Sequence, residues 1–381
     1  MAKKNIILST GLAMFSMFFG SGNLVFPLLV GQMSAGHYLS ATLGILLTGV
    51  IVPFMGILAM ILFNGDSNAF FQRLGKPAKF WFPLIALSLM GPFGVLARCI
   101  TVAHGAFRLV SPTTELWLFS LVSCALIFFL TIKKNKIVPL LGSVLTPLLL
   151  LSLASIAFFG LTNTGLPEIS GSDLWAPFKY GFLQGYQTMD LLAAFFFSVF
   201  VLQHLKAHQA MTDHPTSALP IFFKASLIGA GLLSSIYFIL VLLGATYAPE
   251  LAHIAPTELL GYIATQTLGS WAAPVVSVAV LLACLTTAIV LASLFADFLK
   301  QEIARQKISS SCSLFITLLI AFCISTLQFS GIMRFICPIL ELIYPALIVL
   351  TIVSIFHKLF GLKIIRMPVA IAIVLKLLST V

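Results

Sequence analysis

The carboxyl side chain of Asp190 stands within a long apolar stretch, GYQTMDLLAAFFF. An ionisable group inside a membrane is expensive and marks a functional site by default. Such a carboxylate can bind a substrate amine, carry a proton or pair with a base. The structural alternative is a place near the outer water interface, or a capping role at the start of a half-helix.

The segment Gly20–Asn23 (GSGN) interrupts an apolar run, and Pro27 follows it. Glycine costs roughly 1 kcal/mol in a helix interior, and proline removes a backbone donor. We therefore expect two half-helices, Met14–Phe19 and Leu24–Gly31. The backbone N–H groups that begin the second half suit a carboxylate, and the carbonyls that end the first suit a cation. The alternative is close packing of helices through small residues.

Two adjacent hydroxyls, Thr286 and Thr287, lie midway along another apolar run. They can supply oxygen ligands to Na⁺, and the alternative is hydrogen bonding to their own helix. Arg98 can pair with a carboxylate, mark an intracellular gate or reach an interface, and His104 is a proton carrier or a structural histidine. Glu341, between two prolines, faces a water path or makes a structural pair.

His204, His208 and His214 lie around one loop but have no nearby thiolate or carboxylate set, which argues against a metal site. The six cysteines form no CxxC pair and are interpreted as small hydrophobic residues. No Walker loop, dinucleotide fingerprint or nucleophile elbow occurs. The sequence therefore supports neither an enzyme nor ATP-driven transport, and it predicts no organic cofactor.

Composition identifies the elements that must position these residues. The 381 residues are 60% hydrophobic and 8% charged, and the mean hydropathy is +1.11. Soluble proteins carry about 25% charged residues, so we expect an all-α polytopic membrane protein. The net charge of +10 is better explained by cytoplasmic loops than by nucleic-acid binding.

Apolar runs long enough to cross a bilayer predict eleven spans. Their expected limits are 6–31, 38–63, 80–108, 115–132, 137–160, 181–204, 221–248, 271–298, 311–329, 336–357 and 365–380. Alternate loops then hold sixteen of the 21 basic residues. This asymmetry predicts a cytoplasmic N-terminus, with the first span, after Lys3 and Lys4, retained as an uncleaved helix.

A long outer connection, 161–180, divides the predicted spans into two groups of five plus one. Five is an odd number, so the second group must have inverted topology. The predicted units are a repeat at 5–160 with a broken first helix, an inverted repeat at 181–357 with a broken sixth helix, and an additional helix in 358–381. Interrupted helices at corresponding positions of inverted halves indicate a transporter binding site.

The motifs FFGSGNLVFP, GYQTMD, ACLTTAIVLAS and IYPALIVL resemble the bacterial branched-chain amino acid:cation symporters, the BrnQ-type carriers of the LIVCS family. The resemblance covers nearly the whole chain and implies the leucine-transporter fold. It further implies uptake of leucine, isoleucine and valine with Na⁺ or H⁺. The chain departs from the family pattern at Ala97, where proline is usual, at Gly105, where an acid is usual, and in ending after about eleven spans instead of twelve.

The resemblance also implies a set of site residues. In this set the glycine-rich turn binds the substrate carboxylate, and two backbone carbonyls before the turn bind the substrate amino group. The sixth span around Asp190 forms the pocket for the substrate side chain, with Phe195–Phe197 supplying apolar surface. The expected substrate residues are Met17, Phe18, Gly20, Ser21, Gly22, Asn23, Thr188, Asp190 and Ala194. The expected Na⁺ residues are Ser16 and Phe19, through their carbonyls, with Ala283, Thr286 and Thr287.

The sequence therefore predicts a secondary active symporter of the bacterial cytoplasmic (inner) membrane that works by alternating access. Its expected partners are an amino acid, a coupling cation and the lipid bilayer, without nucleic acid, and no oligomeric state is predicted. One alternative is a carrier of the same fold for another amino acid or small solute. A channel or a non-transporting receptor is the other, which the lack of an appended signalling domain disfavours.

Overall fold

The computed structural model describes residues 2–132, 137–162, 167, 173–211, 218–269, 271–361 and 366–378, and all regular structure in them is helical. The α-helices of the first half are α1 Ala2–Phe18, α2 Ser21–Ser34, α3 Tyr38–Leu46, α4 Val52–Leu62, α5 Ser67–Phe71, α6 Ala78–Met90, α7 Val95–Arg108, α8 Leu116–Ile132 and α9 Ile137–Thr162. Those of the second half are α10 Trp175–Gln187, α11 Asp190–Met211, α12 Ala218–Thr246, α13 Ala248–Leu251, α14 Leu259–Leu268, α15 Ala272–Phe298, α16 Ser310–Ser325, α17 Gln328–Phe360 and α18 Arg366–Leu378. Short 3₁₀ or π turns are η1 Ala35–His37, η2 Leu47–Ile51, η3 Gln72–Leu74 and η4 Leu299–Ile303.

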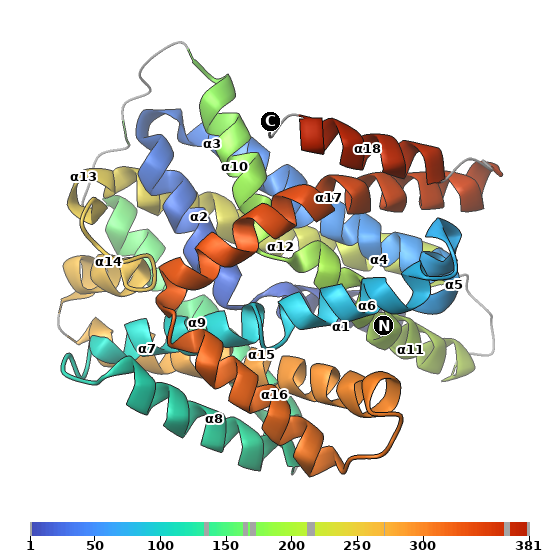
Figure 1. The fold of residues 1–381 in the computed structure, drawn as a ribbon. Helices are drawn as coiled ribbons and strands as arrows, with labels where there is room; N and C mark the ends of the chain where they lie inside the picture. The colour runs from blue at the N-terminus through green and yellow to red at the C-terminus, as the bar shows by residue number, and fades with distance from the viewer. Residues whose placement is uncertain are drawn as a thin grey trace.

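Helices from the two halves of the chain pack against each other around the interrupted ones. The helix α2 packs on α12, α3 on α10, α4 on α11, and α7 on α15 (Figure 1). Small residues permit the closest approach: a Cβ built on Gly181 of α10 would lie 2.0 Å from the carbonyl oxygen of Ala41 in α3. Such contacts between glycine and backbone are typical of helix packing in lipid.

Five helical stretches in the described part of the chain are long and apolar enough to cross a membrane: Ser21–Leu62, Ala78–Arg108, Pro220–Thr246, Ala273–Ile303 and Gln328–Phe360. Four shorter apolar helices accompany them: Ile6–Phe18, Leu116–Ile132, Leu150–Thr162 and Ser310–Ser325. The predicted count of eleven spans is therefore not confirmed. Large apolar side chains such as Leu39 and Leu43 of α3 are exposed, as expected for a surface that faces lipid.

Several predicted boundaries were wrong. The helix α10 begins at Trp175, inside the predicted outer connection 161–180. The turn between α16 and α17 lies at residues 326–327, inside the predicted ninth span. The connection before α15 contains the two short helices α13 and α14. Because apolar composition alone defined the predicted limits, amphipathic helix ends and short helices between the spans were missed.

The last predicted span, 365–380, corresponds to the short helix α18. Its 13 described residues extend about 20 Å at 1.5 Å per residue, less than a ~30 Å hydrocarbon core. It packs against α17 (Figure 1), and Lys376 Nζ lies 3.1 Å from Glu341 Oε2. Glu341 thus makes the structural pair that was one of its two sequence interpretations.

The third predicted span, 80–108, is interrupted, which the sequence analysis did not predict. The helix α6 ends at Met90, and α7 begins at Val95 after the segment Gly91–Gly94 (GPFG). Pro92 has no N–H to donate, and a Cβ built on Gly94 would lie 1.9 Å from the carbonyl oxygen of Leu89. This position therefore requires glycine, and the third helix is built from two parts.

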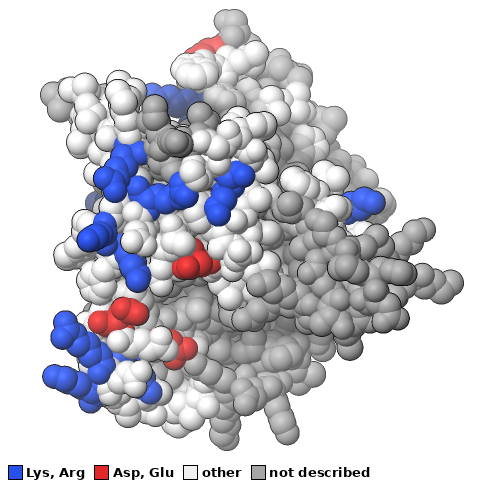
Figure 2. Space-filling model, turned by 90° about the vertical axis from the view of Figure 1, so that its right-hand side faces the viewer, with Lys and Arg blue, Asp and Glu red and all other residues white. Residues whose placement is uncertain are grey.

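Basic side chains are prominent on one face of the molecule. Figure 2 views the molecule from the side on which α5 and the C-terminal end of α17 lie in Figure 1, and Lys and Arg outnumber Asp and Glu among its coloured atoms. Basic residues near this end include Arg73 in η3, Lys300 in η4 and Lys358 in α17. Among the described residues, this face is therefore predominantly basic.

Candidate functional site

The first interruption is narrower than the sequence predicted. The helix α1 ends at Phe18 and α2 begins at Ser21, so Phe19 and Gly20 alone separate them. Gly20 N–H donates to Asn23 Oδ1 at 3.2 Å. Ser21, Gly22 and Asn23 therefore form the first turn of α2, where backbone N–H groups have no intrahelical partner.

The second interruption lies between α10 and α11 and consists of Thr188 and Met189. Met189 has φ +59°, a conformation that costs energy in a non-glycine residue. Thr188 Oγ1 donates to the carbonyl of Gly185 at 3.0 Å and lies 3.4 Å from Asp190 N. Asp190 is the first residue of α11, so its N–H is one of the groups that the helix itself leaves unsatisfied. The break predicted in the sixth helix is thus confined to two residues.

Three buried side chains join these two interruptions to α12. Asn23 Nδ2 donates to Asp190 Oδ2 at 2.7 Å and lies 2.6 Å from Tyr237 Oη, and Tyr237 Oη donates to Asp190 Oδ2 at 3.3 Å. Exposure of Asp190 is 4%. A buried carboxylate requires such donors to replace water. Tyr237 was not predicted, because a single tyrosine within an apolar run gives no signal that it faces a distant acid.

A small cavity lies where the interruptions meet. A Cβ built on Gly22 would lie 3.5 Å from the Cα of Thr188, which brings α2 beside the gap in the sixth helix. The cavity has a volume of about 30 Å³, room for only about two water molecules. Its lining residues are Met17, Phe18, Gly20, Ser21, Gly22, Asn23, Met90, Val95, Thr188, Met189, Asp190, Ala193, Phe197, Thr287 and Leu291. The third-helix interruption borders it through Met90 and Val95.

Eight of the nine expected substrate residues line this cavity, and Ala194 does not. A Cβ built on Gly56 of α4 would lie 3.1 Å from Ala194 Cβ, so Ala194 faces α4. Phe195 likewise packs on Phe70 and Phe71, with ring centroids 5.2 and 5.5 Å away. Besides Asp190, the α11 residues that line the cavity are instead Ala193 and Phe197, which are one helical turn apart.

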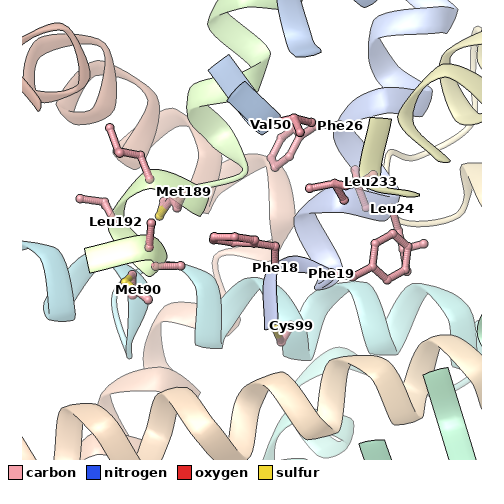
Figure 3. Close-up of a cluster of buried hydrophobic side chains, with 14 of the residues drawn as sticks. Phe18, Phe19, Leu24, Phe26, Val50, Met90, Cys99, Met189, Leu192 and Leu233 are labelled. Carbon is pink, nitrogen blue, oxygen red and sulfur yellow. The ribbon is translucent and has the colours of Figure 1, made fainter. Parts of the chain in front are cut away.

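Apolar side chains form the other walls of the cavity. Figure 3 shows Phe18 at the end of α1 and Met189 and Leu192 near the start of α11, with Met90 from α6 nearby; Phe18, Met90 and Met189 are lining residues. Apart from Thr287 of α15, the polar lining residues lie at the helix interruptions. The arrangement can bind a small molecule with a charged end and an apolar end.

The expected cation residues lie on α1, α15 and the segment between α1 and α2. Thr287 is close to the first interruption, since a Cβ built on Gly20 would lie 3.5 Å from Thr287 Oγ1. Thr286 and Thr287 donate to the carbonyl of Ala283 at 2.9 and 3.1 Å, the bonding that the alternative interpretation predicted. Their hydroxyl oxygens keep lone pairs for a cation. Ser16 and Phe19 lie at the end of α1, where helix carbonyls lack intrahelical partners.

Arg98 of α7 is buried, with an exposure of 1%. Its Nη1 donates to the carbonyl of Gln187, the last residue of α10, at 2.8 Å. Its guanidinium carbon lies 5.3 Å from the ring centroid of Phe26 in α2, within cation–π distance. The interface interpretation of Arg98 was therefore wrong. His104, on the same helix, has its Nε2 at 2.8 Å from the carbonyl of Thr114, as a structural histidine would. The side chains of His204, His208 and His214 lie outside the described residues.

Comparison with known proteins gives consistent results along the whole chain. A family model described as branched-chain amino acid transport protein matches residues 3–381. The branched-chain amino acid permease BrnQ of Corynebacterium glutamicum is 32% identical, over 95% of this chain and 84% of its own. The branched-chain amino acid permease BraB of Bacillus subtilis is 30% identical, over 92% of this chain and 80% of its own. The branched-chain amino acid transport system 2 carrier protein of Pseudomonas aeruginosa is 28% identical, over 93% of this chain and 81% of its own.

Solved structures show the same fold at low sequence identity. Mhp1, a nucleobase-cation-symport-1 family transporter in a closed conformation with bromovinylhydantoin bound, gives a TM-score of 0.59 at 17% identity, over 93% of this chain and 78% of that one. MhsT in complex with L-phenylalanine gives a TM-score of 0.54 at 15% identity, over 98% of this chain and 98% of that one. The fold is therefore that of leucine-transporter-type proteins.

Proposed function

We propose that this chain, which belongs to the family of branched-chain amino acid transport proteins, imports leucine, isoleucine and valine by alternating access. The chain is a membrane transporter and not an enzyme. The observation that carries the proposal is the small cavity at the meeting point of three interrupted helices, lined by Asp190 and by Gly20–Asn23. Interrupted helices at mid-membrane expose backbone groups for a substrate.

The cavity suits the two ends of an aliphatic amino acid. The free N–H groups of the first turn of α2, at Ser21 and Gly22, favour a carboxylate. The carboxylate of Asp190 and the terminal carbonyls of α1, at Met17 and Phe18, favour an ammonium group. Val95, Met90, Phe197 and Leu291 provide apolar surface for a branched side chain. Because about 30 Å³ is too small for leucine, binding requires the helices to separate.

The coupling ion in the proposal is Na⁺, held by Ser16, Phe19, Ala283, Thr286 and Thr287. The proximity of Gly20 to Thr287 supports this site, because it brings the end of α1 against α15. Oxygen ligands from carbonyls and hydroxyls suit a hard cation. H⁺ is the other coupling ion that the site permits, with Asp190 as its carrier.

The proposal includes the organisation of the chain in the membrane. Two inverted five-helix repeats, 5–160 and 181–357, are joined by the connection 161–180 and followed by an additional helix in 358–381. The basic face in Figure 2 supports a cytoplasmic position for that end of the bundle, and hence for the N-terminus, by the positive-inside rule. The membrane is the bacterial cytoplasmic membrane.

Uptake of labelled leucine by proteoliposomes tests the proposal. With the purified protein we expect saturable accumulation when an inward Na⁺ gradient is present and much less when K⁺ replaces Na⁺. Accumulation driven equally well by an inward H⁺ gradient alone would assign the coupling to H⁺. If leucine, isoleucine and valine all fail to accumulate or to exchange under either gradient, the proposed substrate class is wrong.

A further inference from the structure

The guanidinium group of Arg98 has binding capacity that its surroundings do not use. Nη1 bonds to Gln187 O, and the same atom lies 3.7 Å from the sulfur of Met333. Among the described residues, Nε and Nη2 are buried and have no hydrogen-bond partner. A buried charge with unsatisfied donors is expensive unless an opposite charge approaches it. Arg98 is therefore equipped to bind an anion.

Arg98 and Asp190 are the two Lys, Arg, Asp or Glu side chains that are buried in the described part of the chain. They flank the gap in the sixth helix, since Arg98 holds the last carbonyl of α10 and Asp190 begins α11. In the described structure they make no ion pair with each other, and Asp190 accepts hydrogen bonds from the uncharged groups of Asn23 and Tyr237. A positive and a negative group held apart in this way match the two ends of a zwitterion.

Arg98 also lies next to the proposed carboxylate position. The neighbouring residue, Cys99, has its sulfur 3.3 Å from Ser21 Oγ in the first turn of α2, and the Arg98 guanidinium lies over Phe26 in the second turn. The guanidinium and the N-terminus of α2 thus act on the same region. Arg98 does not line the cavity in this structure, but the lining residue Thr188 directly follows Gln187, whose carbonyl accepts the hydrogen bond from Arg98.

We propose that Arg98 binds the α-carboxylate of the transported amino acid through its two free nitrogens, while Asp190 binds the α-ammonium group. This assignment rests on the proposed function and adds a requirement to it, namely that the substrate carry a free carboxylate. Planar guanidinium binds carboxylate in a bidentate way and more strongly than neutral donors do. Separation of the helices during opening brings the two nitrogens into contact with the substrate.

A purely structural role for Arg98 makes a different prediction. If Arg98 only fixes the end of α10 through Gln187, its loss weakens the binding of every ligand by the same factor. If it binds the carboxylate, its loss weakens only ligands that have one. Leucinamide keeps the ammonium group and side chain of leucine but lacks the carboxylate, so the ratio of the two affinities separates the two roles.

The experiment is equilibrium binding of labelled leucine and labelled leucinamide to the purified full-length protein. The variants are Arg98→Gln and Arg98→Lys, with Arg108→Gln as a matched control, because Arg108 is a partly exposed arginine on the same helix that pairs with Glu258 at 2.7 Å. Monodispersity in size-exclusion chromatography establishes that each variant is folded. We expect wild type and Arg108→Gln to prefer leucine by about 10- to 100-fold, Arg98→Gln to lose this preference, and Arg98→Lys to retain part of it.

Each outcome bears on one of the two proposals. An unchanged ratio in Arg98→Gln, or equal losses for leucine and leucinamide in a folded variant, would overturn the carboxylate assignment and leave the proposed transport function intact. Absence of saturable leucine binding in the wild-type protein, with all three branched-chain amino acids tested, would overturn the proposed function itself.

Discussion

The side-chain amide of Asn23 donates a 2.7 Å hydrogen bond to the carboxylate of Asp190. This bond joins the start of α2 to the start of α11 across 167 residues of sequence, and Tyr237 of α12 contacts both partners. Since both residues line the cavity, these bonds fix the position of the carboxylate that we propose to bind the substrate amine. The packing around the cavity is therefore stabilised by the same groups that we propose to bind substrate.

Removal of the Tyr237 hydroxyl tests this network with little change in shape. Tyr237→Phe leaves Asp190 with one donor fewer, and we expect leucine affinity to fall by about 10-fold, in line with about 1.5 kcal/mol for a hydrogen bond to a charged group. Equilibrium binding of labelled leucine to the purified variant measures this loss of affinity. Tyr247→Phe is the matched control, because its hydroxyl bonds to the carbonyl of Gly160 at 3.2 Å, outside the cavity. Equal losses in the two variants would contradict a specific role for Tyr237.

Neutralising Asp190 tests its proposed contact with the substrate amine. Asp190→Asn preserves size but removes the charge, and we expect saturable leucine uptake in proteoliposomes to fall by about 100-fold, because a charged hydrogen bond contributes up to about 3 kcal/mol. Glu250→Gln removes an acid from an exposed surface position and should leave uptake unchanged. If the Asp190→Asn variant took up leucine as fast as the wild-type protein, the carboxylate would bind neither substrate nor coupling ion.

The positions of two helix interruptions could be predicted because glycine and a buried acid are costly in an apolar run. The Gly20–Asn23 segment and Asp190 both lie at interruptions in the structure. The third interruption, Gly91–Gly94, carried an equally visible signal, a proline between two glycines, but the run was assigned as a single helix by hydropathy alone. Local backbone chemistry is thus a better guide to such sites than the length of an apolar run.

Removal of a hydroxyl from α15 tests the Na⁺ site. Thr287→Ala should raise the Na⁺ concentration that gives half-maximal leucine uptake by about 10-fold, on the order of one lost ligand contact. Thr246→Ala removes a hydroxyl that bonds to the carbonyl of Leu242 in its own helix, as Thr287 does with Ala283, and it lies outside the cavity lining. The same Na⁺ dependence in Thr287→Ala and wild type would argue against the site.

Two glycine substitutions test the packing that places the interrupted helices. Gly181→Ala forces a Cβ to within 2.0 Å of a backbone oxygen of α3, and we expect it to destabilise the protein by about 1–3 kcal/mol. Gly231 of α12 has no atom within 4 Å of the added Cβ, so Gly231→Ala should stabilise its helix by up to about 1 kcal/mol. Thermal unfolding in detergent should therefore shift in opposite directions. A shift of the unfolding temperature in the same direction for both variants would contradict the close packing of α3 and α10.

Contacts between distant helices could not be predicted from one sequence. The side chains of Ala193 and Ala194 differ only in position, and the rotation of α11 decides which one lines the cavity. Tyr237 likewise needs the packing of α12 on α2 to reach Asp190. Since apolar residues cover all sides of membrane helices, periodicity does not identify the face that points to the site.

Equilibrium binding of labelled leucine to purified Ala193→Phe tests most directly whether the cavity between the interrupted helices is the substrate site. The added ring exceeds the volume of the cavity, whereas Ala125→Phe places the same ring on an exposed face of α8. We predict that Ala193→Phe remains monodisperse but binds leucine at least about 100-fold more weakly than wild type, and that Ala125→Phe binds it as wild type does. Undiminished leucine binding by folded Ala193→Phe would contradict the account.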